Sequence, residues 1–255
     1  MKKHSRKTIA EGIERLQPWF HNIDLAGQDT DPNNPDHPRA RWKVIHADFP
    51  GQMQGKTVLD LGCASGYFSL ELSALGARVL AVDWEERAIA QVSFAAEVLG
   101  LDIECRLQNI YEFVLANDQV FDYVLFMGVF YHLRHPLLVT DQLARMTREA
   151  LFFQTVLSNH EDTVDPELPD NFSDRSLLAT PGFPAMYFLE RRFGGILNNW
   201  FVCNESAVRA MLRSSGFHPP QKRGEDCFVC KPDHAALTSD HPAWDLHAIR
   251  RFATS

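Results

Sequence analysis

Short apolar runs alternate with helical periods between residue 56 and about residue 157, and this alternation is the strongest constraint on the fold. The runs predict buried strands at residues 57–61, 78–83, 103–108, 121–128 and 150–156. Between them apolar side chains recur at helical spacing, as Ile89, Val92 and Ala96 do. Strands that alternate with helices form parallel pairs joined by crossovers, so we expect a doubly wound α/β domain with a mostly parallel sheet.

The remaining segments flank or interrupt this core. We expect one helix at about residues 6–16, a second near residues 40–49, and a last one capped by Asn204 and followed by a hairpin of residues 217–223 and 226–231. The predicted divisions are an N-terminal helical flap (1–50), a ligand-binding core (51–157), an acidic and then aromatic lid insertion after the fifth strand (158–203), the last helix and hairpin of the core (204–231), and a C-terminal extension (232–255).

Composition excludes several classes of protein. The net charge of −8 argues against a nucleic-acid surface that extends over the whole chain. No apolar run is long enough to span a membrane and no apolar segment follows the basic start, so we expect a cytoplasmic protein. The five cysteines do not resemble a disulfide scaffold. Only Cys227 and Cys230 have a metal-like spacing, and because they lack further ligands we expect a strand there and no metal site.

The turn after the first predicted strand, in VLDLGCASGYF (58–68), indicates what the sheet binds. It lacks the Lys and Ser/Thr of a triphosphate-binding loop, and its glycines are not spaced as in a nicotinamide-binding turn. Asp60 stands immediately before it. A carboxylate is repelled by a diphosphate and attracted by a cation, so the turn favours a cationic ligand.

This turn, followed by a strand that ends in Asp83, resembles the motif of class I S-adenosylmethionine-dependent methyltransferases. The resemblance implies a seven-stranded, Rossmann-like sheet and S-adenosylmethionine as the cofactor. It implies that Asp83 binds the ribose hydroxyls, although an Asp in this place can also cap the next helix. The other positions that the resemblance assigns to the cofactor are Asp60, Gly62, Cys63, Ala64, Gly66, Trp84, Asn109, Ile110, Met127, Gly128, Tyr131 and Trp42. Ala64 replaces a usual glycine, and we expect it to keep a negative φ.

Residues 19–218 resemble a subgroup of bacterial methyltransferases that share W-F-H-N-I and G-V-x-Y-H-L-R-H-P, and GVFYHLRHP (128–136) also resembles the tRNA wobble-uridine carboxymethyltransferases. The basic residues with which the tRNA enzymes hold a carboxylated cofactor have no clear counterpart in this sequence. This resemblance implies either a small-molecule acceptor or tRNA.

Transfer of a methyl group from a sulfonium requires a general base only when the acceptor is not already nucleophilic. His132 and His135 are the first candidates for that base and His21 is the next, while a structural hydrogen bond is the alternative for each. Tyr131 is a candidate contact of cofactor or acceptor. The candidate acceptor-binding residues are His21, Tyr187, Glu190, Asn199 and Trp200.

We therefore expect a methyltransferase that acts on an oxygen of a small organic acceptor such as a natural product. A tRNA-modifying methyl or carboxymethyl transferase is the second hypothesis, and a non-catalytic module that binds S-adenosylmethionine and regulates a partner is the third. Neither the acceptor nor the oligomeric state follows from the sequence.

Overall fold

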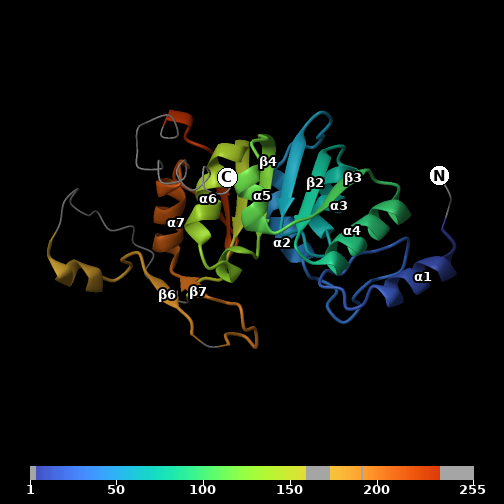
Figure 1. The fold of residues 1–255 in the computed structure, drawn as a ribbon, viewed down its shortest axis with the longest axis horizontal. Helices are drawn as coiled ribbons and strands as arrows, with labels where there is room; N and C mark the ends of the chain where they lie inside the picture. The colour runs from blue at the N-terminus through green and yellow to red at the C-terminus, as the bar shows by residue number, and fades with distance from the viewer. Residues whose placement is uncertain (1–3, 159–172, 191, 236–255) are drawn as a thin grey trace.

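The computed structural model describes residues 4–158, 173–190 and 192–235. Its main sheet has seven strands in the order β3-β2-β1-β4-β5-β9-β8 (Figure 1). The strands are β1 (Thr57–Leu61), β2 (Arg78–Asp83), β3 (Ile103–Leu107), β4 (Phe121–Met127), β5 (Thr147–Gln154), β8 (Gln221–Arg223) and β9 (Cys227–Cys230). The first five run parallel, β9 is antiparallel to β5, and β8 is antiparallel to β9. The predicted doubly wound α/β fold is confirmed.

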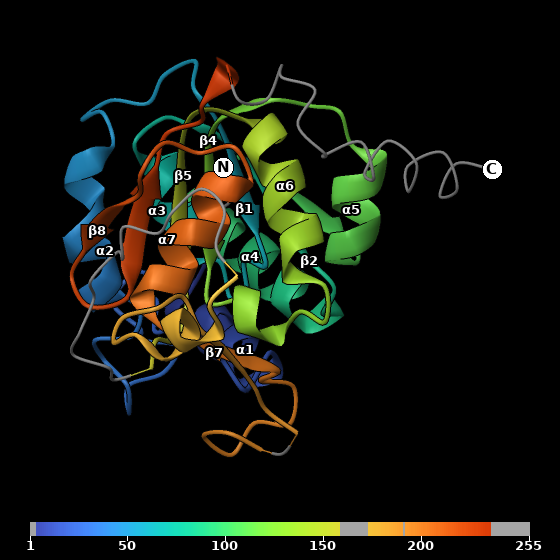
Figure 2. The ribbon, with the colours of Figure 1, turned by 90° about the vertical axis from the view of Figure 1, so that its left-hand side faces the viewer.

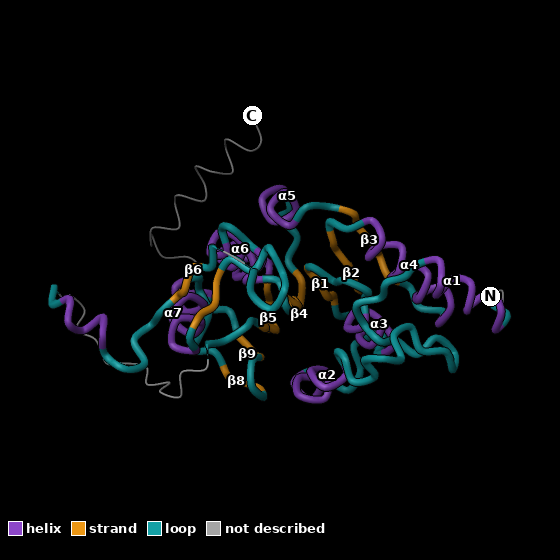
Figure 3. The backbone as a smooth tube through the Cα atoms, turned by 90° about the horizontal axis from the view of Figure 1, so that it is seen from below, coloured by secondary structure: helices purple, strands orange, loops and turns teal. Residues whose placement is uncertain are grey.

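Helices cover both faces of the sheet, with α5 and α6 on one side and α2 and α3 on the other (Figures 2 and 3). The helices are α1 (Arg6–Arg15), α2 (Arg39–Ile45), α3 (Tyr67–Ala74), α4 (Glu86–Leu99), α5 (Ile110–Ala116), α6 (Pro136–Met146) and α7 (Glu205–Ser214), with 3-10 turns η1 (His46–Asp48), η2 (Phe130–His132) and η3 (Arg175–Ala179). Alternate strand residues face the two layers: Val58 packs in the cluster of α1 and α3, and Leu59 in that of α5, α6 and α7.

Several expectations differ from the structure in detail. The second helix ends at Ile45 and continues as η1, and β5 begins at Thr147, earlier than the apolar run suggested. Helix α5 was not expected, because its span is too short for periodicity to identify. The predicted hairpin is confirmed as β8 and β9, so Cys227 and Cys230 lie on a strand, and all five thiols are free. None of the described helices could cross a membrane.

The insertion after β5 contains a second, two-stranded sheet in which β6 (Met186–Phe188) pairs antiparallel with β7 (Phe201–Cys203). It lies beyond one end of the main sheet (Figure 1). Residues 159–172 and 191 of the expected lid, and 236–255 of the expected extension, lie outside the described residues. Asn204 joins the insertion to the core: its Oδ1 accepts hydrogen bonds from Ala207 N and Ala185 N, and its Nδ2 donates one to Phe183 O.

We predict that Asn204→Ala lowers the free energy of unfolding by about 2 to 4 kcal/mol, because it removes a helix cap and leaves buried backbone groups without partners. Urea unfolding measures this loss. Ser5→Ala removes the exposed cap of α1 and is the matched control, with an expected loss of about 1 kcal/mol or less. Equal losses in the two variants would contradict the joining role of Asn204.

Candidate active site

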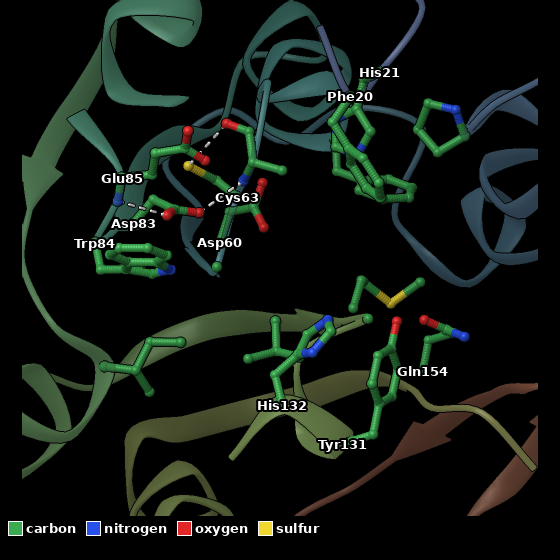
Figure 4. A pocket seen from close by; sticks show the side chains of 18 of the residues that line it. Phe20, His21, Asp60, Cys63, Asp83, Trp84, Glu85, Tyr131, His132 and Gln154 are labelled. Carbon is green, nitrogen blue, oxygen red and sulfur yellow. Dashed lines mark hydrogen bonds between the residues drawn. The ribbon is translucent and has the colours of Figure 1, made fainter. Parts of the chain in front are cut away.

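A cavity of about 770 Å³ lies at the carboxyl ends of β1, β2 and β4. Asp60, Asp83 and Trp84 lie on one side of it, and Tyr131, His132 and Gln154 face them from the other (Figure 4). The N-terminal segment supplies a further part of the wall, including Phe20 and His21. Because ligands of doubly wound sheets bind at this edge, where the strand order reverses between β1 and β4, the cavity is the candidate active site.

The turn after β1 is packed too closely for side chains at its two glycines. Gly62 has a φ of +81°, and a Cβ there would lie 2.5 Å from Val129. Gly66 has a φ of +84°, and a Cβ there would lie 2.5 Å from Val92 of α4. Gly62, Cys63 and Ala64 line the cavity, whereas Gly66 starts α3 and does not. Gly66 therefore shapes the turn, and its neighbours form the cavity wall.

The expected negative φ of Ala64 is wrong: its φ is +47°. In this conformation the backbone N–H of Ala64 donates a hydrogen bond to Asp83 Oδ2 at 3.0 Å. Asp83 is the last residue of β2. The left-handed region costs a residue with a Cβ about 1 to 2 kcal/mol. The fold accepts this cost because the turn is held on both sides, by β1 and by Asp83.

Asp83 is buried, and both carboxylate oxygens accept backbone hydrogen bonds, Oδ2 from Ala64 N and Oδ1 from Glu85 N. Burial raises the pKa of Asp83. The alternative role as a helix cap is wrong: the N-cap of α4 is Glu85, without a side-chain cap, and Asp83 bonds the backbone of the turn before the helix. Asp83 lines the cavity, and its carboxylate has further lone pairs for a ligand. Trp84 beside it is 68% exposed, an unusual state for so large an apolar ring unless a ligand covers it.

Asp60 is the most deeply buried carboxylate of the cavity wall, with 2% of its surface exposed. Ser69 Oγ donates a hydrogen bond to its Oδ2 at 2.6 Å. Burial raises the pKa of Asp60 to about 6, and the charge of Asp83 adds to the rise. A cation bound beside Asp60 would relieve this penalty.

Ser65 connects the turn to the N-terminal segment, a role that no local sequence pattern indicates. Its Oγ accepts hydrogen bonds from Phe20 N at 3.0 Å and His21 N at 3.4 Å, and it donates one to Gln91 Oε1. Gln91 Nε2 in turn donates to the carbonyls of Leu16 and Pro18. The side chains of Ser65 and Gln91 are buried, so the network fixes the N-terminal wall of the cavity against the turn.

His21 lies in that wall but is not suited to act as a base. Tyr67 N donates a hydrogen bond to its Nδ1 at 3.3 Å, which places the ring proton on Nε2. Burial, and then the charges of His37 and Arg41, lower the pKa of His21 to about 3. The ring is therefore neutral at physiological pH, and its free nitrogen is a hydrogen-bond donor.

His132 has the opposite tautomer. Its Nδ1 lies 3.2 Å from Asn198 O and donates to that carbonyl, so Nε2 keeps its lone pair. Burial lowers the pKa of His132 below its ordinary value. Tyr131 is different, because burial raises its pKa and the hydroxyl remains a donor. Of the three candidate histidines, His132 alone combines a position in the cavity wall with a free basic nitrogen.

The other predicted site residues have different surroundings. Asn109, Ile110, Met127 and Gly128 line the cavity, and Asn109 also caps α5 by accepting a hydrogen bond from Tyr111 N. The predicted site residues that do not line the cavity are Gly66, Trp42, His135, Tyr187, Glu190, Asn199 and Trp200.

Four of these residues, Trp42, His135, Asn199 and Trp200, make contacts outside the cavity that account for their positions. The Trp42 ring packs against Phe49 and Phe68, and His135 packs against Tyr111. Asn199 donates a hydrogen bond to Phe193 O, while Trp200 N donates one to Tyr131 O at 2.7 Å. Tyr187 and Glu190 are exposed. The insertion thus contributes Ile196 and Asn198 to the cavity wall, and backbone groups of Asn198 and Trp200 bond to His132 and Tyr131.

Several polar residues at the cavity were not predicted, and three of them bond to one another: Arg41, Gln154 and Asp226. Arg41 and Gln154 line the cavity. Asp226 Oδ2 accepts hydrogen bonds from Arg41 at 2.9 Å and from Gln154 Nε2 at 2.6 Å. Arg41 and Asp226 are 185 positions apart in the chain, and no local pattern indicates that they meet.

We predict that Ala64→Gly raises the free energy of unfolding by about 0.5 to 1 kcal/mol, because relief of the left-handed conformation exceeds the entropic cost of glycine. Ala90→Gly in α4 is the control, with an expected loss of about 1 kcal/mol. Chemical denaturation of both variants measures the difference. A loss in Ala64→Gly equal to that of the control would contradict the strain at Ala64.

Comparisons with known proteins agree with this geometry. A family described as a methyltransferase domain matches residues 52–190, more than half of the chain. A tRNA U34 carboxymethyltransferase of Pseudomonas fluorescens Pf-5 is 28% identical over 94% of this chain and 74% of its own length. One of Serratia proteamaculans is 27% identical over 81% of this chain and 59% of its own length. The chain thus spans between 59% and 74% of the length of these two relatives.

Solved structures show the same fold. The N-terminal domain of EvdMO1, solved with SAH bound, has a TM-score of 0.62 at 20% identity and covers 90% of this chain and 97% of its own. The PH0226 protein of Pyrococcus horikoshii has a TM-score of 0.54 at 19% identity and covers 86% of this chain and 98% of its own. With the carboxylate-flanked turn, the sheet order and the family match, the chain belongs to the methyltransferase domain family and is an S-adenosylmethionine-dependent methyltransferase of class I.

Proposed function

We propose that this enzyme methylates an oxygen of a small organic acceptor. The observation that carries the proposal is the charge of the cavity wall. Its acidic residues are Asp60, Asp83 and Glu85, and among the described lining residues the permanent cations are Arg41 and Arg87. Each of these arginines is paired with a carboxylate, Arg41 with Asp226 and Arg87 with Glu85. Such a wall favours a sulfonium cofactor and disfavours a polyanionic acceptor.

The residues present fit the cofactor. Asp83 would accept hydrogen bonds from the ribose hydroxyls, the exposed Trp84 ring would cover the adenine, and Asp60 would lie beside a cationic group of the cofactor. S-adenosylmethionine supplies a methyl group that is already activated by its sulfonium. The protein therefore contributes alignment of the acceptor and exclusion of water.

His132 is the group that would take a proton from an acceptor hydroxyl. Its Nε2 keeps a lone pair, and its lowered pKa leaves it neutral at physiological pH. Tyr131 and Gln154 lie beside it and present polar atoms that can orient the acceptor. An acceptor that is already ionised would need only the orienting groups.

The first test of this function is transfer of labelled methyl from S-adenosylmethionine to a metabolite extract, followed by isolation of the labelled product. We expect label on an oxygen of a small molecule, and Asp83→Ala should abolish most of the incorporation by weakening the cofactor complex at least about tenfold. Cofactor binding without turnover on any extract would instead support a regulatory binding module.

A tRNA-modifying activity is the second candidate, because the tRNA U34 carboxymethyltransferases of Pseudomonas and Serratia are similar over most of this chain. It requires association with tRNA that weakens steeply as salt increases, and a modified nucleoside in digests of the tRNA. Filter binding at several salt concentrations and mass spectrometry of the digests distinguish the two candidates.

We predict that the affinity for S-adenosylmethionine falls as the pH drops below about 6. The pKa of Asp60 is raised to about 6 in the free protein, and a bound cation lowers it, so binding releases a proton in this range. Affinity should be nearly constant from pH 6.5 to 7 and fall toward tenfold per pH unit below pH 6. Calorimetry in two buffers of different ionisation enthalpy measures the released proton, and Asp60→Asn should remove it. Affinity that does not change between pH 5 and 7 would contradict the role of Asp60.

We predict that His132→Ala lowers kcat by about 100-fold or more while the affinity for the cofactor stays within about threefold. Because the pKa of His132 lies below its ordinary value, wild-type kcat should be constant through neutral pH and fall only in acid, as the imidazole becomes protonated. This acidic limb should be missing in the variant. His135→Ala is the comparison, since His135 lies outside the cavity wall. If the fall of kcat in acid disappeared in His135→Ala and persisted in His132→Ala, the general base would be His135 and not His132.

A further inference from the structure

Two polar atoms meet at the carboxyl end of β4, beside Met127 and Gly128, which the resemblance to the methyltransferases assigns to the cofactor. A Cβ built on Gly128 would lie 3.3 Å from Gln154 Oε1 and 3.5 Å from Tyr131 Oη. Gln154 is buried at the end of β5, and Tyr131 lies on η2, directly after β4. A cofactor group that extends past Gly128 toward the acceptor would therefore meet the oxygen of Gln154 and the hydroxyl of Tyr131.

Asp226 determines which end of the Gln154 amide faces the cavity. Since Gln154 pairs with Cys227 of β9, the residue before β9 lies directly beside it. The Asp226 carboxylate accepts a hydrogen bond from Gln154 Nε2 at 2.6 Å. An ionised carboxylate only accepts, so the amide must turn its nitrogen to Asp226 and its oxygen to Gly128.

Asp226 also neutralises Arg41. The guanidinium donates to Asp226 at 2.9 Å, and the Nε of Arg41 is buried without a partner among the described residues. The two charges act in opposite directions on the pKa of Tyr131, which burial raises: Arg41 lowers it and Asp226 raises it. At the Tyr131 hydroxyl Asp226 thus offsets part of the positive potential of Arg41.

These contacts disfavour the binding of an anionic group at the carboxyl end of β4. A carboxylate there would face the Gln154 oxygen, and Arg41, the cation that lines the cavity nearby, is already paired with Asp226. An uncharged methyl group meets no such repulsion. We propose that Asp226 makes the site selective for S-adenosylmethionine over a cofactor whose transferred methyl carries a carboxylate, an inference that rests on the proposed function.

The test compares three ligands by calorimetry: S-adenosylmethionine, its carboxymethyl analogue, and S-adenosylhomocysteine, which lacks the transferred group. Wild-type protein should bind S-adenosylmethionine at least about tenfold more tightly than the carboxymethyl analogue. Asp226→Asn frees Arg41 and lets the Gln154 amide rotate, so this ratio should shift toward the analogue by at least about tenfold. The affinity for S-adenosylhomocysteine should change by less than about threefold, which shows that the rest of the cavity is intact.

Two further variants make the result specific. Arg41→Met combined with Asp226→Asn should lose the gain for the carboxymethyl analogue, because the freed cation is then absent. Glu104→Gln makes the same change in charge at an exposed ion pair with Arg106, on the edge strand β3, and should leave the ratio unchanged.

A wild-type protein that binds the carboxymethyl analogue as tightly as S-adenosylmethionine would overturn the proposal, as would an unchanged ratio in Asp226→Asn. If Asp226→Asn fails to bind S-adenosylhomocysteine, its cavity is no longer intact. The proposal is then tested by the wild-type protein alone, through the ratio of its affinities for S-adenosylmethionine and the carboxymethyl analogue. Failure of the wild-type protein to bind any of the three ligands would instead refute the proposed function, and the inference with it.

Discussion

The hydrogen bond between the backbone N–H of Ala64 and the carboxylate of Asp83 holds the cofactor edge of this enzyme together. It joins the turn after β1 to the end of β2, and it exists because the parallel register places those two strand ends side by side. The bond keeps a non-glycine residue in the left-handed region and brings two carboxylates, Asp60 and Asp83, to one cavity. An edge built in this way repels phosphate and attracts a cation.

The same turn also supports the N-terminal segment. Ser65 lies next to Ala64 and accepts hydrogen bonds from the backbone of Phe20 and His21, so the chain that precedes the core becomes part of the cavity wall. Arg41 enters from that segment and meets Asp226, which comes from the opposite end of the described core. The chemistry near the transferred group therefore depends on contacts between the first and last parts of the fold.

Patterns of neighbouring residues in the sequence predicted the features that depend on neighbouring residues, namely strands, a helix cap and a turn. The apolar runs became strands with nearly the expected bounds, Asn204 became a helix cap, and the carboxylate-flanked turn became a cavity wall. Contacts between distant residues could not be predicted in this way. The bond from Phe20 to Ser65 spans 45 positions and the Arg41–Asp226 pair spans 185. The positive φ of Ala64 follows from the bond to Asp83, and only the folded register reveals it.

The most direct test of the account is equilibrium dialysis of the purified protein with labelled S-adenosylmethionine in competition with unlabelled S-adenosylhomocysteine, NADH and ATP. We expect saturable binding at about micromolar concentration, displacement by S-adenosylhomocysteine, and no displacement by an equal concentration of NADH or ATP. Displacement by either phosphate-bearing nucleotide, or no binding of S-adenosylmethionine, would contradict it.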